Sequence, residues 1–509
     1  MAQYRMNAYD ADVFIPEFKG LYQYGDHIDE DLRFSPDCMN IATPAGVLQP
    51  SMVFEDRGEG VFRSTPTTPT PTAAQYCTLM RYYGTGWEYV LGAGNTLYKG
   101  TQNPNTHEFS WTGIQSGLRA NGFSWCVYEY TPEGETDPKS VLLITNTTDG
   151  MYVVDGNTVT AVQTPKKFAK IEVYGERIWG CGATDEPDTI YYSAPYSFSD
   201  WDQDNVDPAS GGGSFREPTW NDDPINSLVR FGDSLIAFTK YRAWKITGVN
   251  IESLYVQEQY GNGTDSPESV AVYKNKVYMV RNGDGICVYD GYSITPISNQ
   301  YAYEYKSFSS ARATIINDQY IVSDTKYPGK LLVHHLLDNT FTVCNSPNIS
   351  SFCEGSNYAM RWYMVPNVST YSGYDVYVKP VECYLNSWEA KKNSGAATKW
   401  TTPWIAFGRR DVKKGGFDMY FSPELSDDAE NPVTFKISFQ TEKKTKTKTY
   451  TVSPLTAEEI AAGKLYKQKK LHFGGSGRKF RMIIETESGF TTPWRLVGGI
   501  HIITETDKD

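Results

Sequence analysis

The sequence lacks the patterns that mark secreted, membrane-spanning and zinc-binding proteins. Its eight cysteines are scattered and form no CxxC pair, which argues against structural zinc and favours free thiols in a reducing compartment. No apolar run comes near the roughly 20 residues that a membrane helix needs. The first residues, MAQYRMNAYDADVF, lack the basic and apolar regions of a signal peptide. We therefore expect a chain that does not insert into membranes.

Helix-forming runs and positive charge are also scarce. Runs of Ala, Leu, Glu and Lys are few, whereas 14% of the residues are aromatic and 43 are glycine. This balance predicts strands joined by tight turns. The chain has 60 acidic and 48 basic residues and a net charge of −12. Such a charge argues against a broad nucleic-acid binder and suits a surface that DNA passes without adhering.

The first part of the chain has little hydrophobic periodicity. We expect residues 1–63 to form an extended N-terminal arm, and residues 64–73, which include STPTTPTPT, to form a linker of extended backbone. An arm of this kind is expected to assist assembly and to be dispensable for folding. The apolar side chains expected to pack against a neighbouring molecule are Phe14, Phe18, Leu21 and Phe34.

Residues 74–385 contain a recurring unit of turns and short strands. Equivalent turns at Gly175, Gly232, Asn275 and Asn317 are separated by 57, 43 and 42 residues. A unit of about 40 to 50 residues with about four strands is typical of a propeller blade. The prediction is an all-β fold containing a β-propeller of six or seven blades. The alternative is a set of unrelated hairpins in β-sandwiches.

Aromatic side chains at similar places in these units are expected to fill the spaces between blades. The alternating strands that carry them, such as RIWGCG, SLIAFT and KVYMVR, have the period of two that β-structure requires. The predicted blade core residues are Trp179, Tyr191, Tyr192, Phe238, Trp244, Tyr278 and Tyr289.

Residues 386–509 change character and predict a C-terminal β-sandwich or jelly-roll domain. One short helix is expected at 457–462, with Gly463 ending it. A run of alternating lysines and threonines places its lysines on one face of a strand. That face is either a solvated sheet edge or a surface that contacts an acidic neighbour or DNA. The lysines are Lys443, Lys444, Lys446 and Lys448.

The sequence offers few candidates for catalysis or metal binding. Asp200, Asp202 and Asp204 imitate the start of a calcium loop, but Asn205 and Gly211 occupy the positions of its glycine and bidentate glutamate. A solvated turn is the favoured interpretation, and these aspartates remain weak metal candidates. The chain has no sialidase-type Asp box and no G-x-S-x-G nucleophile motif. We therefore predict no catalytic residues and no cofactor.

The order of motifs in the blades resembles a family of phage tail proteins, over roughly residues 170–509. The C-terminal WTTPW and RKFRMIIE segments are also similar to the end domain of such proteins. The matching blade residues are Gly175, Arg177, Ile178 and Trp179, then Tyr191, Tyr192, Ser193 and Trp201, then Pro224, Ile225, Gly232, Asp233, Phe238 and Trp244, then Ser266, Pro267, Ser269 and Val270, and finally Gly285, Tyr289, Asp290 and Gly291. Together they resemble tail hub, nozzle or packaged-DNA stabilisation proteins of short-tailed bacteriophages.

This resemblance implies a structural, non-enzymatic virion protein of a tail or neck, assembled in the cytoplasm of the bacterial host. It implies a ring or nozzle of several copies, with a hexamer favoured, around the channel used in DNA ejection. Its partners would be other tail, adaptor or fibre proteins, and genomic DNA would pass it transiently. The alternatives are a tail protein that binds a receptor or polysaccharide, and a glycan depolymerase with paired carboxylates in the propeller's central mouth.

Overall fold

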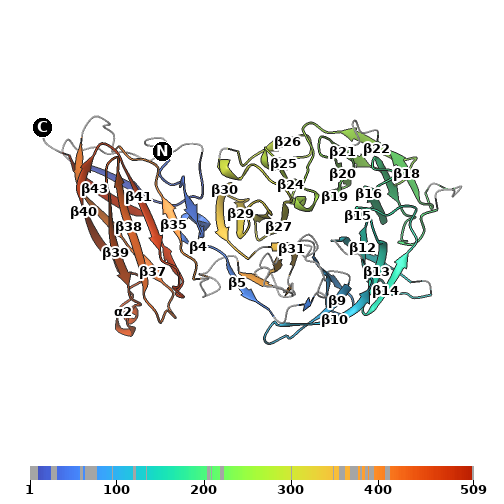
Figure 1. Ribbon diagram of the computed structural model, residues 1–509, viewed down its shortest axis with the longest axis horizontal. Helices are drawn as coiled ribbons and strands as arrows, with labels where there is room; N and C mark the ends of the chain where they lie inside the picture. The colour runs from blue at the N-terminus through green and yellow to red at the C-terminus, as the bar shows by residue number, and fades with distance from the viewer. Residues whose placement is uncertain are drawn as a thin grey trace, which may run out of the picture.

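The repeated units fold as four-stranded antiparallel sheets arranged around a common centre (Figure 1). Within the described residues seven such sheets form the blades of a β-propeller, so the predicted fold class is confirmed and the blade number is seven. The computed structural model describes residues 10–23, 31–57, 61–62, 77–93, 96–118, 122–132, 134–202, 207, 209–217, 223–299, 301–347, 349–354, 362–366, 377–378, 381–384, 388, 395–406 and 413–506.

Blades 1 to 6 are each built from four consecutive strands. The first strands of successive blades contact one another and surround the centre. Blade 1 consists of β7 (Thr78–Tyr83), β8 (Trp87–Ala93), β9 (Thr96–Gln102) and β10 (Phe109–Ser116). Blade 2 consists of β11 (Ser124–Tyr130), β12 (Lys139–Asn146), β13 (Gly150–Asp155) and β14 (Thr158–Val162). Blade 3 consists of β15 (Lys170–Tyr174), β16 (Arg177–Cys181), β17 (Thr189–Tyr192) and β18 (Gly213–Arg216). Blade 4 consists of β19 (Ser227–Phe231), β20 (Ser234–Phe238), β21 (Ala243–Thr247) and β22 (Tyr255–Glu258). Blade 5 consists of β23 (Ala271–Tyr273), β24 (Lys276–Arg281), β25 (Gly285–Tyr289) and β26 (Ile294–Pro296). Blade 6 consists of β27 (Arg312–Ile316), β28 (Gln319–Ser323), β29 (Lys330–His335) and β30 (Thr340–Asn345).

The turns used to find the repeat are equivalent hairpins. In blades 3 to 6, two residues connect the first strand to the second, and these turns include Gly175, Gly232, Asn275 and Asn317. The φ angles of Gly175 and Gly232 are +57° and +62°. Two-residue hairpins need this left-handed backbone, which glycine adopts without strain. The turn chemistry therefore marked the blade period correctly.

Aromatic side chains fill the spaces between blades. Trp179, Tyr192 and Trp244 share one cluster between blades 3 and 4, and the Trp179 indole nitrogen donates a hydrogen bond to the Tyr174 carbonyl at 2.8 Å. The Trp179 ring thus contributes apolar burial while its polar atom keeps a partner. All the aromatic residues predicted for the blade core are buried: Trp179, Tyr191, Tyr192, Phe238, Trp244, Tyr278 and Tyr289.

The seventh blade takes its outer strand from the beginning of the chain. It consists of β31 (Ile349–Glu354), β32 (Trp362–Pro366), β34 (Val381–Tyr384) and β5 (Val53–Asp56). Strand β5 pairs antiparallel with β34. Just beyond it, Arg57 forms an ion pair with the fully buried Glu382 at 2.5 Å. The propeller thus extends beyond the predicted range 74–385, because its closure requires a strand from the N-terminal segment.

The C-terminal domain is a sandwich of a four-stranded and a five-stranded sheet (Figure 1). Phe417, Phe439, Phe473 and Phe480 belong to the buried core between these sheets. The four-stranded sheet has the order β1 (Asp10–Ile15), β43 (Ile500–Thr506), β36 (Lys414–Phe421) and β40 (Lys469–Gly477). The five-stranded sheet has the order β2 (Cys38–Met39), β35 (Lys399–Thr401), β41 (Phe480–Thr486), β38 (Val433–Thr441) and β39 (Thr445–Val452). Outside these sheets, β37 (Pro423–Leu425) pairs with β42 (Trp494–Leu496), and β33 (Tyr377–Val378) pairs with β6 (Val61–Phe62).

The N-terminal segment is part of both domains and differs from the expected free arm. Strands β1 and β2 pair with the sandwich, and β3 (Ile41–Ala42) pairs with β4 (Gln49–Pro50) between the sandwich and the propeller. Gly20 approaches the Phe341 carbonyl of blade 6 too closely to leave room for a Cβ. The described part of the segment therefore connects the two domains of its own chain, while residues 64–73 lie outside the described residues.

The predicted contact residues of the arm are used mostly inside the molecule. Phe18 and Leu21 are buried in a core that continues from blades 5 and 6 into the sandwich, so their assignment to a contact with a neighbour is wrong. Phe34 is half-buried against Tyr301. Phe14 remains exposed beside His501. Burial within one chain takes precedence because these apolar side chains complete a core that the chain already forms.

The short helix predicted near residue 460 is present. Helix α2 (Ala457–Ala461) begins with a capping box in which Thr456 and Glu459 bond each other's backbone N–H groups. Gly463 follows it with a φ of +73°, a backbone that favours glycine at a helix end. None of the helices in the described residues has the length and apolar character of a membrane span.

We expect deletion of residues 2–57 to destabilise the whole protein. The deletion removes β5 from the seventh blade and β1 and β2 from the sandwich, which exposes three sheet edges. Deletion of residues 2–9, which removes none of these strands, serves as the control. Melting followed by circular dichroism should show a cooperative transition for the control and a lower or absent one for the longer deletion. An unchanged transition for the longer deletion would contradict this assignment of β5.

Blade 6 contains a buried histidine whose protonation should affect stability. His334 stacks on Phe341 with centroids 4.3 Å apart, and its Nε2 donates to Asn339 Oδ1 at 2.8 Å. Burial lowers the pKa of His334 from 6.5 to about 4. In the unfolded chain the same imidazole binds a proton at higher pH. Protonation between these two pKa values therefore favours unfolding.

The free energy of unfolding should fall by roughly 3 kcal/mol between pH 6.5 and pH 4 because of this histidine alone. His334→Gln keeps a donor for Asn339 but does not titrate. Urea unfolding at pH 7 and pH 4.5 should give a smaller loss for this variant than for the unmodified protein. Equal losses would show that His334 does not contribute.

Candidate functional site: the central channel

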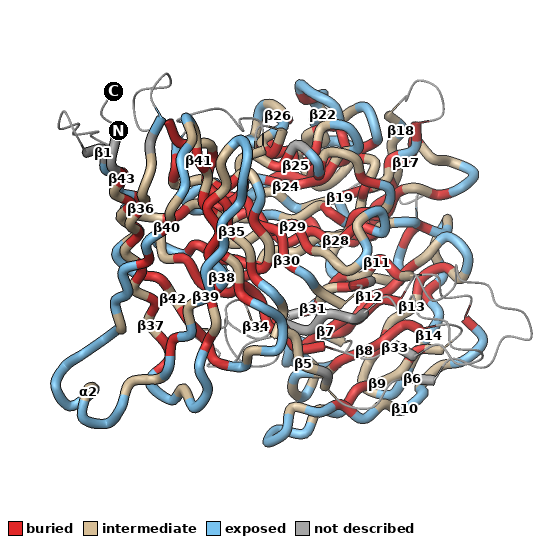
Figure 2. The backbone as a smooth tube through the Cα atoms, turned by 60° about the vertical axis from the view of Figure 1, so that its left-hand side comes forward, coloured by how far each residue is buried: buried red, intermediate tan, exposed pale blue. Residues whose placement is uncertain are grey.

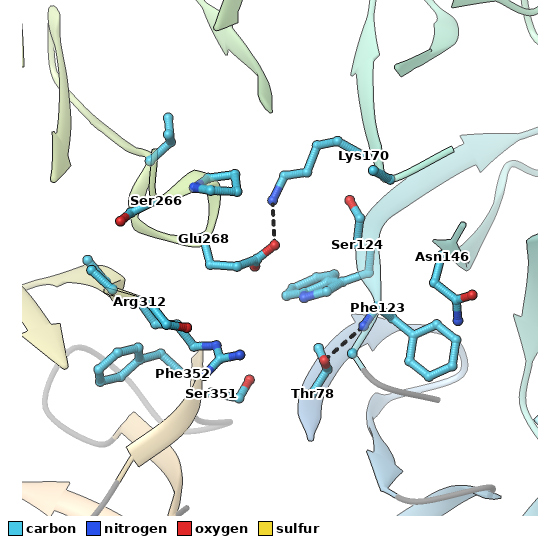
Figure 3. Close-up of a pocket in the computed structure, with 18 of the residues that line it drawn as sticks. Thr78, Phe123, Ser124, Asn146, Lys170, Ser266, Glu268, Arg312, Ser351 and Phe352 are labelled. Carbon is cyan, nitrogen blue, oxygen red and sulfur yellow. Dashed lines mark hydrogen bonds and ion pairs between the residues drawn. The ribbon is translucent and has the colours of Figure 1, made fainter. Parts of the chain in front are cut away.

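A hollow lies at the centre of the propeller. It has a volume of about 660 Å³ and is lined by residues from blades 1, 2, 3, 5, 6 and 7. Several of these residues stand at the start of the innermost strands, among them Thr78, Ser124, Lys170 and Arg312. Figure 3 shows these side chains converging from separate blades on one opening. The propeller centre therefore brings polar and charged side chains of six blades to one opening.

An ion pair crosses part of this opening. Lys170 begins β15 in blade 3, and Glu268 lies in the 3₁₀ turn η4 (Pro267–Ser269) that precedes blade 5. The Lys170 Nζ and Glu268 Oε1 atoms are 3.4 Å apart (Figure 3). Arg312 of blade 6 lies on the other side of Glu268 in the same view. The pair connects two blades that are not adjacent and reduces the free width of the opening.

The hydroxyl groups around the channel connect neighbouring blades. Ser351 Oγ of blade 7 accepts a hydrogen bond from the Leu79 N–H of blade 1 at 3.1 Å. Thr78 Oγ1 accepts from the Phe123 N–H at 3.0 Å, and Ser124 Oγ accepts from a blade 3 N–H at 3.1 Å. These bonds satisfy backbone donors of adjacent blades. The hydroxyls thus support closure of the ring.

The carboxylates of the channel do not form the arrangement of a glycosidase. The described lining residues include two, Asp265 and Glu268, and both belong to the loop before blade 5. Asp265 Oδ1 accepts a hydrogen bond from the Asn282 N–H at 3.0 Å, while Glu268 is paired with Lys170. Glycosidases place two carboxyl groups on either side of the bond that they cleave. The described lining instead places both on one side.

The size of the channel limits what one copy of the chain can admit. A hollow of about 660 Å³ is in the range of sites for small molecules. Double-stranded DNA, whose major groove alone is about 12 Å wide, needs a far larger passage. A channel for DNA would therefore have to form between copies of the chain.

Two of the three aspartates proposed as weak metal candidates are among the described residues. Asp200 and Asp202 are exposed, and Asp200 Oδ1 accepts a hydrogen bond from the Asp202 N–H at 3.0 Å. Asp204 lies outside the described residues. The described residues contain no group of three His, Cys, Asp or Glu side chains placed to hold a metal ion.

The predicted lysine face lies on the free edge of the sandwich. Lys446 and Lys448 are opposite Phe439 and Ile437 in the β38–β39 ladder. The Lys448 ammonium lies 5.8 Å from the centre of the Phe473 ring. These two side chains therefore cover the rim of the core with their stems and expose their charges. Lys443 and Lys444 lie in the exposed hairpin turn before β39.

The channel residues Lys170, Glu268 and Arg312 were not identified from the sequence. The signal available was positional, because Lys170 and Arg312 occupy the first place of the innermost strands. Most of the corresponding residues in other blades are serine or threonine, so a charged residue there is a departure from the repeat. Their convergence depends on ring closure, which no local pattern specifies.

We expect Ser351→Ala to weaken closure of the ring. The substitution leaves the buried Leu79 N–H without its partner, which should lower the free energy of unfolding by about 1–3 kcal/mol. The exposed Thr158→Ala, in the outer strand of blade 2, is the control and should change it by less than about 0.5 kcal/mol. Urea unfolding monitored by tryptophan fluorescence measures both. Equal stability of the two variants would contradict the role assigned to Ser351.

Comparison with known proteins places the chain beside solved structures of low similarity. No protein-family model and no curated protein matches it. It is similar to a chain of a mitotic checkpoint complex, at 7% identity and a TM-score of 0.38, covering 65% of this chain and 95% of that one. It is also similar to YjhT, at 8% identity and a TM-score of 0.32, covering 55% and 99%. The corresponding values for BBS1N, solved in complex with ARL6DN, are 11%, 0.28, 60% and 76%.

Proposed function

We propose that this chain is a structural component of a bacteriophage tail or neck, in which several copies form a ring around the path of the DNA. The order of blade motifs described above supports this proposal through its resemblance to tail hub and nozzle proteins. The structural observation that carries it furthest is the separation of charge along one continuous body.

Positive charge is concentrated at one end of the sequence and of the molecule. Residues 443–481, here called the basic region, contain eleven Lys and Arg and two Glu, a net charge of +9. Because the whole chain has a net charge of −12, the remainder carries −21. The basic region includes β39 and β40, which are the edge strands of the two sandwich sheets. Figure 1 places these strands on the side of the sandwich away from the propeller.

The basic region also exposes apolar side chains. The segment around α2 projects from the sandwich and is largely exposed (Figure 2). Ile460, Leu465 and Tyr466 are exposed there beside Lys464 and Lys467. An apolar patch bordered by charge is typical of a contact between proteins. In a head-to-tail ring this patch would contact the acidic remainder of the next copy.

The N-terminal segment connects the propeller and the sandwich rigidly, as a structural ring would require. Its strands belong to both the propeller and the sandwich, and a common core continues between the two. A force applied to the sandwich is then transmitted to the propeller, because no flexible linker separates the two domains in the described residues. The absence of an acidic pair across the described channel favours this role over a depolymerase.

Assembly of the purified chain tests the proposal. Light scattering and negative-stain microscopy at about 50 μM are expected to show closed rings, with a hexamer favoured by the resemblance. Rings held partly by charge should dissociate as salt is raised to about 1 M, where the screening length is about 3 Å. Mass spectrometry of purified phage particles should detect the chain in the virion. A chain that stays monomeric and is absent from particles would refute the proposal.

Charge reversal in the basic region should weaken the ring. Lys443→Glu with Lys444→Glu changes two exposed side chains in a turn, so the fold should be retained. The control is Lys276→Glu, an exposed lysine in blade 5. The double variant should shift light-scattering mass towards the monomer at concentrations where the control remains assembled. Equal assembly of the two would show that this turn is not at the interface.

A further inference from the structure

The hairpin turn between the first two strands of blade 1 exposes two large aromatic rings. Trp87 is 50% exposed and Tyr83 is 54% exposed. Their ring centres are 5.2 Å apart, and the rings are nearly perpendicular, at 80°. Such exposure leaves apolar surface in water, which has a free-energy cost that binding of a ligand would remove. The two exposed rings therefore form an apolar surface suited to binding a ligand.

The tryptophan ring is held in place from one side. The Arg81 guanidinium carbon lies 3.2 Å from the centre of the Trp87 ring, and Arg81 itself is buried. This cation–π contact restrains the ring while half of its surface stays in solvent. An aromatic platform that is already oriented loses little conformational entropy when a ligand stacks on it.

Two hollows adjoin this turn and share part of their walls. One has a volume of about 540 Å³ and extends to blade 2, and the other has a volume of about 400 Å³ and lies along blade 1. Thr85, Glu88 and Lys99 line both. Tyr83 lines the first and Trp87 the second. The two hollows form neighbouring subsites on the two sides of a common ridge.

The ridge between the hollows is a fixed polar network. Lys99 Nζ lies 3.1 Å from Glu88 Oε2, and the hydroxyl of Tyr82 donates to the same carboxylate at 2.7 Å. The Gly156 N–H of blade 2 donates to the Tyr82 oxygen at 2.7 Å. Burial, with Glu88 adding to it, raises the pKa of Tyr82, so this hydroxyl remains a donor. The polar groups are therefore placed before any ligand arrives.

The charges around the hollows are nearly balanced. Lys99 pairs with Glu88, and Lys139 pairs with Asp155 at 2.6 Å. Glu129 also lines the larger hollow. A strongly anionic or cationic ligand would find little net attraction here. Hydroxyl-rich ligands, which donate and accept hydrogen bonds without net charge, match this lining.

We propose that this turn of blade 1 is a binding site for a neutral polysaccharide, with one sugar unit stacked on Trp87 and the next across the Glu88–Lys99 ridge. Sugar rings combine an apolar C–H face with hydroxyls on their edge, which fits a platform beside fixed polar groups. The site goes beyond the structural role proposed above, and it does not require several copies of the chain to assemble. In a virion it would supply contact with the polysaccharide of a bacterial surface.

A glycan array of purified bacterial capsular and O-chain polysaccharides, both neutral and anionic, tests the site with the full-length chain. Neutral polymers should bind, and titration calorimetry with oligosaccharides of the strongest of them should give the affinity. Trp87→Ala should lower that affinity by about tenfold or more, because stacking on an aromatic ring contributes about 1–3 kcal/mol to binding. Trp87→Phe keeps a ring and should retain part of the affinity. Glu88→Gln should also weaken binding.

The matched control is Tyr292→Ala, which removes an exposed aromatic ring from blade 5. It should bind as the unmodified protein does. Affinity should change by less than about twofold between 0.05 and 0.5 M salt, since the ligand is uncharged. Three results would each overturn the proposal: no polysaccharide bound at millimolar concentration, equal binding by Trp87→Ala, or binding confined to anionic polymers. Loss of ring assembly in Trp87→Ala with no glycan bound would reassign the turn to a protein contact and leave the structural role intact.

Discussion

Closure of the propeller is the constraint on which the rest of the structure depends. An incomplete last blade would expose both an open strand edge and the apolar face of its neighbour, which closure of the ring prevents. Here the closing strand is β5, which lies about 330 residues before its partner β34 in the sequence. The ion pair of Arg57 with the buried Glu382 stands beside this ladder. The N-terminal segment is thus held in place by the need to close the ring.

That placement determines how the second domain is attached. With β5 in blade 7, the preceding residues must cross the side of the propeller, where Phe18 and Leu21 enter a core shared with the sandwich. Strands β1 and β2 then each form one edge of a sandwich sheet. The opposite edges, β39 and β40, remain free and carry the basic region. The polarity of charge that supports a head-to-tail ring follows from this arrangement.

Closure also determines where ligands have room to bind. At the centre, Ser351 and Thr78 connect adjacent blades through hydrogen bonds, and Lys170 pairs across the opening with Glu268. Polar groups used in this way are less free to recognise a ligand. The turn with Tyr83 and Trp87 instead exposes its rings beside fixed polar groups. The propeller thus combines a centre whose polar groups pair with one another and a turn of blade 1 whose aromatic rings are exposed.

Local sequence determined the strands, the hairpin turns and the blade period, because the φ requirements of Gly175 and Gly232 and the alternation of buried aromatics depend on neighbours in the chain. It also determined the sandwich strands and the short helix before Gly463. Only the tertiary structure decided that Val53–Asp56 closes the seventh blade, since pairing across some 330 residues leaves no local pattern. For the same reason Phe18 and Leu21 resembled the contacts of a free arm, and the meeting of Lys170 with Glu268 was not foreseen. Those side chains meet because the ring closes.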